Sequence, residues 1–341
     1  MKTKACFILV SLLIALSFVG SGLCSGAEGW SETYKVGTIA PKGIAWALQM
    51  DRIVFPEVAK ATDGNLVIKV YWGGVMGDDE AIIKKMRIGQ LHGAGMSGYG
   101  CTLAIPEMAV MQLPFLFNNW QEVDYVKEKM APIFDEITRD HDYMVIAYID
   151  QDFDVFFSSK YDMTKVEEFA QAKIISWSGA LEGEVLQAIG AHPIPVSMTE
   201  APTSIRQGIG DTIIAPKAWA VGTQLYSILK YVSPLNIRYS PAVMLLTWEA
   251  YEQMPQDYRD RFMAVRPKIM RDFCLAARED NEKCLNALLE YGIKQREMSP
   301  EEKAKLESMA HTVWEDQAGQ QYPAELLEQI QDHLEEFRSN K

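Results

Sequence analysis

Short β-branched runs alternate with amphipathic helical stretches from residue 34 onward. The first series consists of predicted strands at 34–39, 66–71 and 92–96, separated by predicted helices at 44–61 and 78–88. Gly64 and Gly89 follow the two helices, at positions where a glycine commonly ends a helix. This β-α-β-α-β order predicts a parallel, doubly wound sheet, because right-handed crossovers place the helices on its faces.

The same order of elements recurs in the second half of the chain. Its predicted strands lie at 173–177, 193–196 and 211–215, and its predicted helices at 181–189 and 199–207. We therefore expect an α/β fold with two doubly wound α/β lobes. Two longer strand-like runs, 144–158 and 236–248, exceed the usual strand length of about 5–6 residues. They are candidates for crossover strands, with hinges predicted near 148–151 and 236–241.

The pattern from residue 255 onward is helical. Predicted helices lie at 255–266, 268–291, 299–317 and 323–338, with Pro267 predicting a kink. The predicted division of the chain is a signal peptide at 1–27, a first lobe at 28–148 and 238–256, a second lobe with a long bridging helix at 149–237 and 257–298, and C-terminal helices at 299–341.

The N-terminus has the features of a secretory signal. Lys2 and Lys4 precede an apolar run at 7–20, and the small residues at 25–27 form a cleavage site. We expect an exported, soluble, periplasmic protein. Because roughly 14 apolar residues are fewer than the ~20 that span a bilayer, an uncleaved anchor is the weaker alternative. Lipidation at Cys24 is a second alternative.

The charge balance argues against two classes of partner. Removal of residues 1–27 takes away two lysines, so the formal net charge changes from −13 to −15. Such a chain repels phosphate backbones and anionic bilayers, so we expect neither nucleic-acid binding nor direct membrane insertion. Three cysteines remain, Cys101, Cys274 and Cys284, and we interpret them as buried thiols rather than a disulfide framework.

No catalytic, metal or cofactor motif stands out. The five histidines are scattered without ligand spacing, and there is no nucleophile elbow, phosphate loop or dinucleotide fingerprint. The glycine-rich segment at 95–100 is interpreted as a loop that lets the backbone approach a ligand or another segment. We therefore predict a binding protein without cofactor or metal, with an enzyme on a two-lobed scaffold and a sensor for a membrane signalling protein as alternatives.

Several segments resemble one family in their order and spacing. They read DGNLVIKVY at 63–71, GDDE at 77–80, KMRIGQLHGA at 85–94, PE at 106–107, LPFLF at 113–117, AIGAHPIP at 188–195, KYV at 230–232 and WEAY at 248–251. Over nearly its whole mature length the chain resembles the periplasmic solute receptor of tripartite ATP-independent periplasmic (TRAP) transporters.

This resemblance implies two lobes of the type II periplasmic-binding-protein kind, joined by strands and braced by a long helix. It also implies that a small organic molecule, either an organic acid or a partly hydrophobic neutral compound, closes the cleft between the lobes. The implied partners are a small and a large integral membrane subunit that import the ligand. The identity of the ligand, the monomer or dimer state and the coupling ion stay open.

The sequence departs from the family at two places. Ile175 stands where many relatives carry a ligand-binding arginine, and Ala215 stands where many carry an asparagine. The candidate ligand-binding residues are Trp72, Tyr99, Gln151, Phe153, Ile175, Trp177, Ala215, Lys217 and Trp219. Core packing is the alternative role for each aromatic residue.

Without the arginine, we expect weak binding of small dicarboxylates and better binding of a ligand whose apolar body stacks on Trp177 or Trp219. Lys42, Lys217 and Arg238 are the cations that could replace the missing arginine.

Overall fold

Two small parallel sheets form the centres of two lobes. The computed structural model describes residues 29–340, so the predicted signal peptide lies outside the described residues. In lobe I, β1 (Glu32–Thr38) pairs in parallel with β2 (Leu66–Tyr71) and β3 (Gly93–Met96). In lobe II, β5 (Lys173–Ser176) pairs in parallel with β6 (His192–Pro195) and β7 (Thr212–Ala215). The predicted strands and the two-lobed α/β fold are thus confirmed.

Two long antiparallel strands join the lobes into one sheet. β4 (Tyr143–Ser158) pairs with β9 (Arg238–Thr247). β9 also pairs with β3 of lobe I, and β4 also pairs with β7 of lobe II. The resulting strand order is β2-β1-β3-β9-β4-β7-β5-β6. The short strand β8 (Tyr231–Val232) pairs with β4, and β10 (Lys294–Gln295) pairs with β8. Both predicted crossover strands therefore lie at the centre of the molecule.

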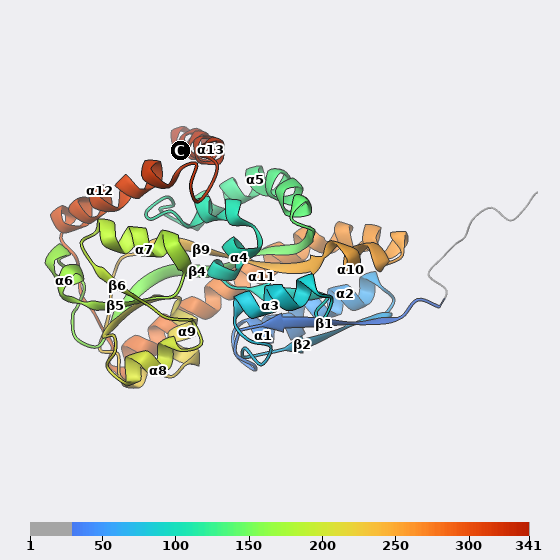
Figure 1. Ribbon diagram of the computed structural model, residues 1–341, viewed down its shortest axis with the longest axis horizontal. Helices are drawn as coiled ribbons and strands as arrows, with labels where there is room; N and C mark the ends of the chain where they lie inside the picture. The colour runs from blue at the N-terminus through green and yellow to red at the C-terminus, as the bar shows by residue number, and fades with distance from the viewer. Residues whose placement is uncertain (1–28, 341) are drawn as a thin grey trace, which may run out of the picture.

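Helices cover both faces of this sheet (Figure 1). The helices of lobe I are α1 (Trp46–Gln49), α2 (Phe55–Ala61), α3 (Asp79–Arg87), α4 (Gly98–Ala104), α5 (Trp120–Asp140) and α10 (Trp248–Gln253), with a π-helical turn at Met50–Val54 and a 3₁₀ helix at Pro106–Gln112. Those of lobe II are α6 (Val166–Gln171), α7 (Gly179–Ala188), α8 (Ala201–Arg206) and α9 (Lys217–Gly222), with a 3₁₀ turn at Leu225–Ser227.

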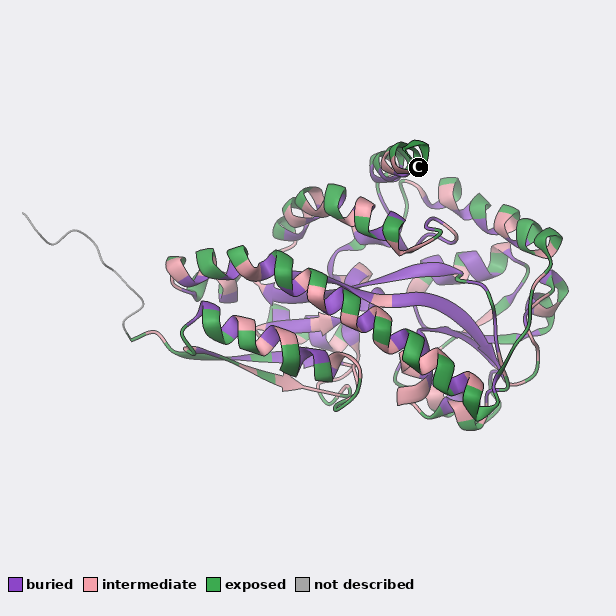
Figure 2. Cartoon of the chain, turned by 180° about the vertical axis from the view of Figure 1, so that it is seen from behind, coloured by how far each residue is buried: buried purple, intermediate pink, exposed green. Residues whose placement is uncertain are grey.

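One long helix, α11 (Gln256–Tyr291), runs across both lobes, and Figure 2 shows it in front of the buried strand pair. The two helices predicted at 255–266 and 268–291 are one, because α11 continues through Pro267. The kink predicted at Pro267 stays a prediction. The chain ends with α12 (Pro300–Gln317) and α13 (Ala324–Ser339), close to the predicted bounds. Asn281 and Ala277 of α11 face the strand pair, as shown by a hydrogen bond from Asn281 Nδ2 to the Gln151 carbonyl.

The glycine-rich segment at 95–100 is not the expected loop. Ser97 caps α4 by accepting a hydrogen bond from the Gly100 amide, so the segment turns directly into a helix. A Cβ at Gly100 would lie 2.6 Å from Cγ of Asp79, and one at Gly98 would lie 2.6 Å from Oγ of Ser240. The glycines therefore permit close packing of α4 against α3 and β9.

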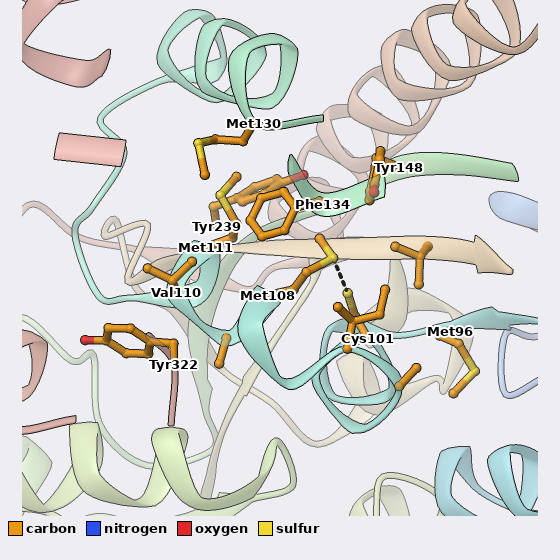
Figure 3. Close-up of a cluster of buried hydrophobic side chains, with 14 of the residues drawn as sticks. Met96, Cys101, Met108, Val110, Met111, Met130, Phe134, Tyr148, Tyr239 and Tyr322 are labelled. Carbon is orange, nitrogen blue, oxygen red and sulfur yellow. Dashed lines mark hydrogen bonds between the residues drawn. The ribbon is translucent and has the colours of Figure 1, made fainter. Parts of the chain in front are cut away.

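The largest core cluster lies under α4 and α5 and is rich in sulfur and aromatic side chains. Figure 3 shows Cys101 and Met108 in contact, with Sγ and Sδ 3.3 Å apart, and Met111, Phe134 and Tyr239 nearby. Burial raises the pKa of the Cys101 thiol well above its usual range. Within the described residues the three cysteines are free: two are buried and Cys284 is half-buried.

The closest backbone approach in the sheet generates a stability prediction. A Cβ at Gly93 would overlap the carbonyl oxygen of Leu245 on β9, so Gly93→Ala should destabilise the protein by about 1–3 kcal/mol through overpacking. At Gly183 in α7 a Cβ meets nothing within 4 Å, so Gly183→Ala should stabilise by about 0.5–1 kcal/mol. Urea denaturation measures both, and equal midpoints for the two variants would contradict the packing argument.

Candidate ligand-binding site

A cavity of about 280 Å³ lies between the lobes, and we call it the interlobe cavity. Four of its lining residues follow parallel strands: Ile39 after β1, Gly73 after β2, Ser97 after β3 and Pro216 after β7. Ligands of α/β sheets lie outside the carboxyl ends of the strands, and both lobes present those ends to this cavity. Its position is therefore that of a binding site.

The crossover strand and α11 close the back of the cavity. The register between β4 and β9 shifts between Asp150 and Asp152, which leaves Gln151 without a strand partner. Such a bulge redirects a side chain, and Gln151 lines the cavity. Its Oε1 accepts hydrogen bonds from the Gly98 amide at 2.9 Å and from Ser240 Oγ at 3.2 Å. The predicted hinge at 148–151 coincides with this bulge, and its motion stays a prediction.

The lobes touch on both sides of the cavity. A Cβ at Gly222 of α9 would lie 2.6 Å from Cδ1 of Ile44 in lobe I. A Cβ at Gly179 of α7 would lie 2.7 Å from the ring of Tyr99 in lobe I. Because these side chains rest on glycine backbone of the other lobe, the lobes are in direct contact, and we call this arrangement the closed form.

A second depression opens between α3 of lobe I and α7 of lobe II, with a volume of about 760 Å³. Five carboxylates line this acidic groove, and no Lys, Arg or His does: Asp78, Asp79, Glu80, Glu184 and Glu200. Asp79 is buried and accepts a short hydrogen bond from Ser97 Oγ. Burial raises the pKa of its carboxyl to about 6, although the Ser97 hydroxyl opposes the shift.

Two of the nine predicted site residues, Gln151 and Trp219, line the interlobe cavity. Tyr99 and Trp177 line the acidic groove instead, and Trp177 donates its indole N–H to the Ile214 carbonyl at 2.7 Å. The other five lie outside both linings: Trp72, Phe153, Ile175, Ala215 and Lys217.

Packing explains where three of those five residues lie. Ile175 is fully buried, and its Cγ1 would lie 2.5 Å from a Cβ at Gly210, so this side chain fills space beside the next strand. Phe153 packs against Trp120 with ring centroids 4.5 Å apart. Trp72 packs on the core of lobe I, while its neighbour Gly73 reaches the cavity.

The cations that could replace the missing arginine already have partners or lie outside the cavity. Lys217 Nζ contacts Asp152 Oδ1 at 3.0 Å and the Phe153 carbonyl at 3.2 Å. Arg238 is buried between Asp154, at 3.0 Å, and Glu182, at 2.7 Å. Lys42 is exposed and does not line the cavity.

The sequence analysis missed several lining residues, notably Trp46, Met198 and Asn281. Asn281 belongs to α11, and its Oδ1 accepts the Ala218 amide at 3.0 Å, so it joins the bridging helix to α9. No sequence pattern marks a residue at the far end of a long helix as part of a cleft. Ser97 could have been found, because it directly follows the strand predicted at 92–96.

Comparisons with known proteins agree with this geometry, which is that of a two-lobed binding protein. The sequence profile of the family "Bacterial extracellular solute-binding protein, family 7" matches residues 54–321. The chain therefore belongs to this family of solute-binding proteins, which confirms the predicted TRAP solute-receptor family.

Solved structures share the fold over almost their whole length. The sugar acid binding protein of Advenella mimigardefordensis strain DPN7T, in complex with galactonate, is similar with a TM-score of 0.84 and 22% identity, covering 90% of this chain and 98% of that one. A TRAP periplasmic solute binding protein of Sulfurospirillum deleyianum with bound succinate has a TM-score of 0.79 and 19% identity, covering 88% and 98%.

Curated relatives match over shorter stretches. A protein of Haemophilus influenzae is 22% identical over 198 residues, which is 57% of this chain and 60% of the relative. The chain spans 37% to 61% of the length of the first four such relatives. Among the described residues, no helix combines the length and apolarity needed to cross a bilayer, and no three His, Cys, Asp or Glu side chains are grouped for a metal ion.

The Lys217–Asp152 pair generates a second prediction. Both side chains are buried, so Lys217→Ala leaves a carboxylate without its counter-charge and should destabilise the protein by about 3–5 kcal/mol. The double variant Asp152→Asn/Lys217→Met should recover most of this loss, because neither of the two replaced side chains then carries a buried charge. Urea denaturation of both variants tests the pair. A Lys217→Ala cost below about 1 kcal/mol would show that the pair is not structural.

Proposed function

We propose that this protein captures a small organic molecule in the interlobe cavity and delivers it to the membrane components of a TRAP-type transporter. The observation that carries the proposal is that both lobes, the crossover strand β4 and the bridging helix α11 all contribute to one cavity. A ligand that touches both lobes stabilises the closed arrangement, because it binds that state better than the open one.

The partners and location belong to the same proposal. The family consists of bacterial extracellular solute-binding proteins, and the similar protein of Sulfurospirillum deleyianum is periplasmic. Residues 1–27 have the pattern of an export signal. We therefore infer a periplasmic protein whose closed form docks on a small and a large integral membrane subunit.

The chemistry of the lining supports binding rather than catalysis. None of the described residues lining the interlobe cavity is Asp, Glu, His, Lys or Cys. General acid–base catalysis needs such a group within hydrogen-bond reach of the substrate. The family likewise consists of solute-binding proteins.

Ligand binding should contract the molecule and depend on Trp219. A thermal-shift screen of acids, amides, amines and alcohols identifies a ligand, which at 100 times its Kd should stabilise the protein by about 2.7 kcal/mol. Small-angle scattering should then show a smaller radius of gyration with ligand. Trp219→Ala should weaken binding at least about tenfold, because it removes a large stacking surface in the cavity.

Trp248 provides the matched control. It is also half-buried, but it stacks with Arg139 at 4.8 Å in lobe I and does not line the cavity. Trp248→Ala should change the affinity less than about twofold. Equal losses in the two variants would place the ligand elsewhere, and the absence of any ligand-dependent contraction would contradict the proposed function.

The contact between Gly222 and Ile44 generates a prediction about closure. Gly222→Leu inserts a side chain where Cδ1 of Ile44 lies in the closed form, whereas an open form has room for it. Scattering with ligand should therefore show reduced contraction for Gly222→Leu, and its affinity should fall at least about tenfold. Adding Ile44→Ala to this variant should restore contraction. Normal closure of Gly222→Leu would show that this contact does not define the closed state.

A further inference from the structure

The interlobe cavity has an uncharged lining. Its walls are apolar side chains, including Ile39, Ile44 and Met198, with Trp46 and Trp219 as its two aromatic residues. The polar side chains that reach it are amides and hydroxyls. A carboxylate entering this cavity would lose its hydration shell and meet no full positive charge in exchange.

The buried cations around the cavity cannot supply that charge without cost. Lys217 and Arg238 are committed to buried carboxylates, as described above. Arg278 of α11 likewise contacts Asp150 at 2.6 Å and also Asp124. Drawing Lys217 or Arg238 to a ligand would leave a buried carboxylate unpaired, which costs several kcal/mol.

The acidic groove adds repulsion to this absence of attraction. Met198 lines both the interlobe cavity and the groove, so the groove with its five carboxylates adjoins the cavity. At neutral pH the field they create is negative at the cleft, and it lowers the local concentration of anions.

Hydrogen-bond donors remain available in the cavity. The Oε1 atom of Gln151 faces an obligate donor, the Gly98 amide, so Nε2 is the free end of this side chain. Nε2 of Gln151 and the indole N–H groups of Trp46 and Trp219 have no hydrogen-bond partner among residues 29–340. Asn281, in contrast, already uses both its oxygen and its nitrogen. The free groups are neutral donors that suit a neutral acceptor.

The volume limits the size of the ligand. The cavity volume of about 280 Å³ lies near the lower end of the range for small-molecule sites, so it suits a small ligand.

We propose that the ligand is a small uncharged molecule, with an apolar body between Trp46 and Trp219 and a carbonyl or ether oxygen facing the free donors. This assignment rests on the proposed function and specifies the ligand class of that site.

Three probes with one skeleton and different charges test the assignment. Phenylacetamide is neutral, phenylacetate is an anion and phenethylamine is a cation at pH 7. Calorimetry should show phenylacetamide binding at least about tenfold more tightly than either charged probe, and succinate not binding at millimolar concentration.

Tighter binding of phenylacetate or succinate than of phenylacetamide would overturn the assignment, and so would tightest binding of phenethylamine. In either case ligand binding, and with it the proposed function, would stand. No binding of any probe would also overturn the assignment. The proposed function would fail as well only if the wider thermal-shift screen found no ligand.

A charged substitution provides the matched test. Thr199 and Thr203 are both exposed, but only Thr199 lines the cavity. Thr199→Arg should strengthen phenylacetate binding at least about tenfold, and added salt should reduce the gain. Thr203→Arg should change it less than about twofold. A gain of equal size in both variants, or none for Thr199→Arg, would show that the missing cation is not what excludes carboxylates.

Discussion

The antiparallel pairing of β4 with β9 is the interaction on which the rest of the molecule depends. It joins the two parallel sheets into one, and it is the path by which the chain passes between lobes. Carboxylates of β4 fix the surrounding helices to this strand pair: Asp150 through Lys127 and Arg278, and Asp152 through Lys217. Asp154 pairs with Arg238 of β9, which also contacts Glu182 of α7. Removing one partner of such a buried ion pair costs more stability than the intact pair contributes. These pairs therefore mainly specify a single arrangement of the strands and helices.

That arrangement has a consequence for binding. Lys217 and Arg238 pair with buried carboxylates where the lobes join, so their positive charges are not available to a ligand. The lowered pKa of Asp150, to about 2, reflects the attraction of Lys127 and Arg278, which outweighs the effect of burial. The interlobe cavity keeps only neutral groups, and the bulge in β4 directs Gln151 toward it. The cations that could bind an anionic ligand are thus the same few that pair with carboxylates where the lobes join.

Two apolar contacts between the lobes rest on glycines. Ile44 and Tyr99 of lobe I rest on Gly222 and Gly179 of lobe II, where no side chain intervenes. Apolar contacts of this kind add little attraction between the lobes in the absence of a ligand. A ligand of modest affinity can therefore shift the balance between open and closed forms.

The sequence by itself determined the elements and their order. Strands such as 66–71 carry a β-branched pattern, helices end at glycines such as Gly89, and these signals depend only on neighbouring residues. Repetition of the β-α-β-α-β order then gave two lobes, and the ends of the predicted strands pointed to the cleft. Local pattern failed at 95–100, where glycines that resemble a loop serve close helix packing, and it divided α11 into two helices at Pro267, where the structure has one.

Only the tertiary structure decided which side chains reach the cavity and which charges remain free. Lys217 follows a lobe II strand and resembles a ligand-binding cation in the sequence, yet Asp152, 65 residues away, takes its charge. Asn281 and Trp46 enter the lining from elements that no sequence pattern connects with a cleft. The physical reason is that contacts between distant segments decide which charges pair and which way side chains point. Secondary structure, in contrast, is set largely by residues a few positions apart.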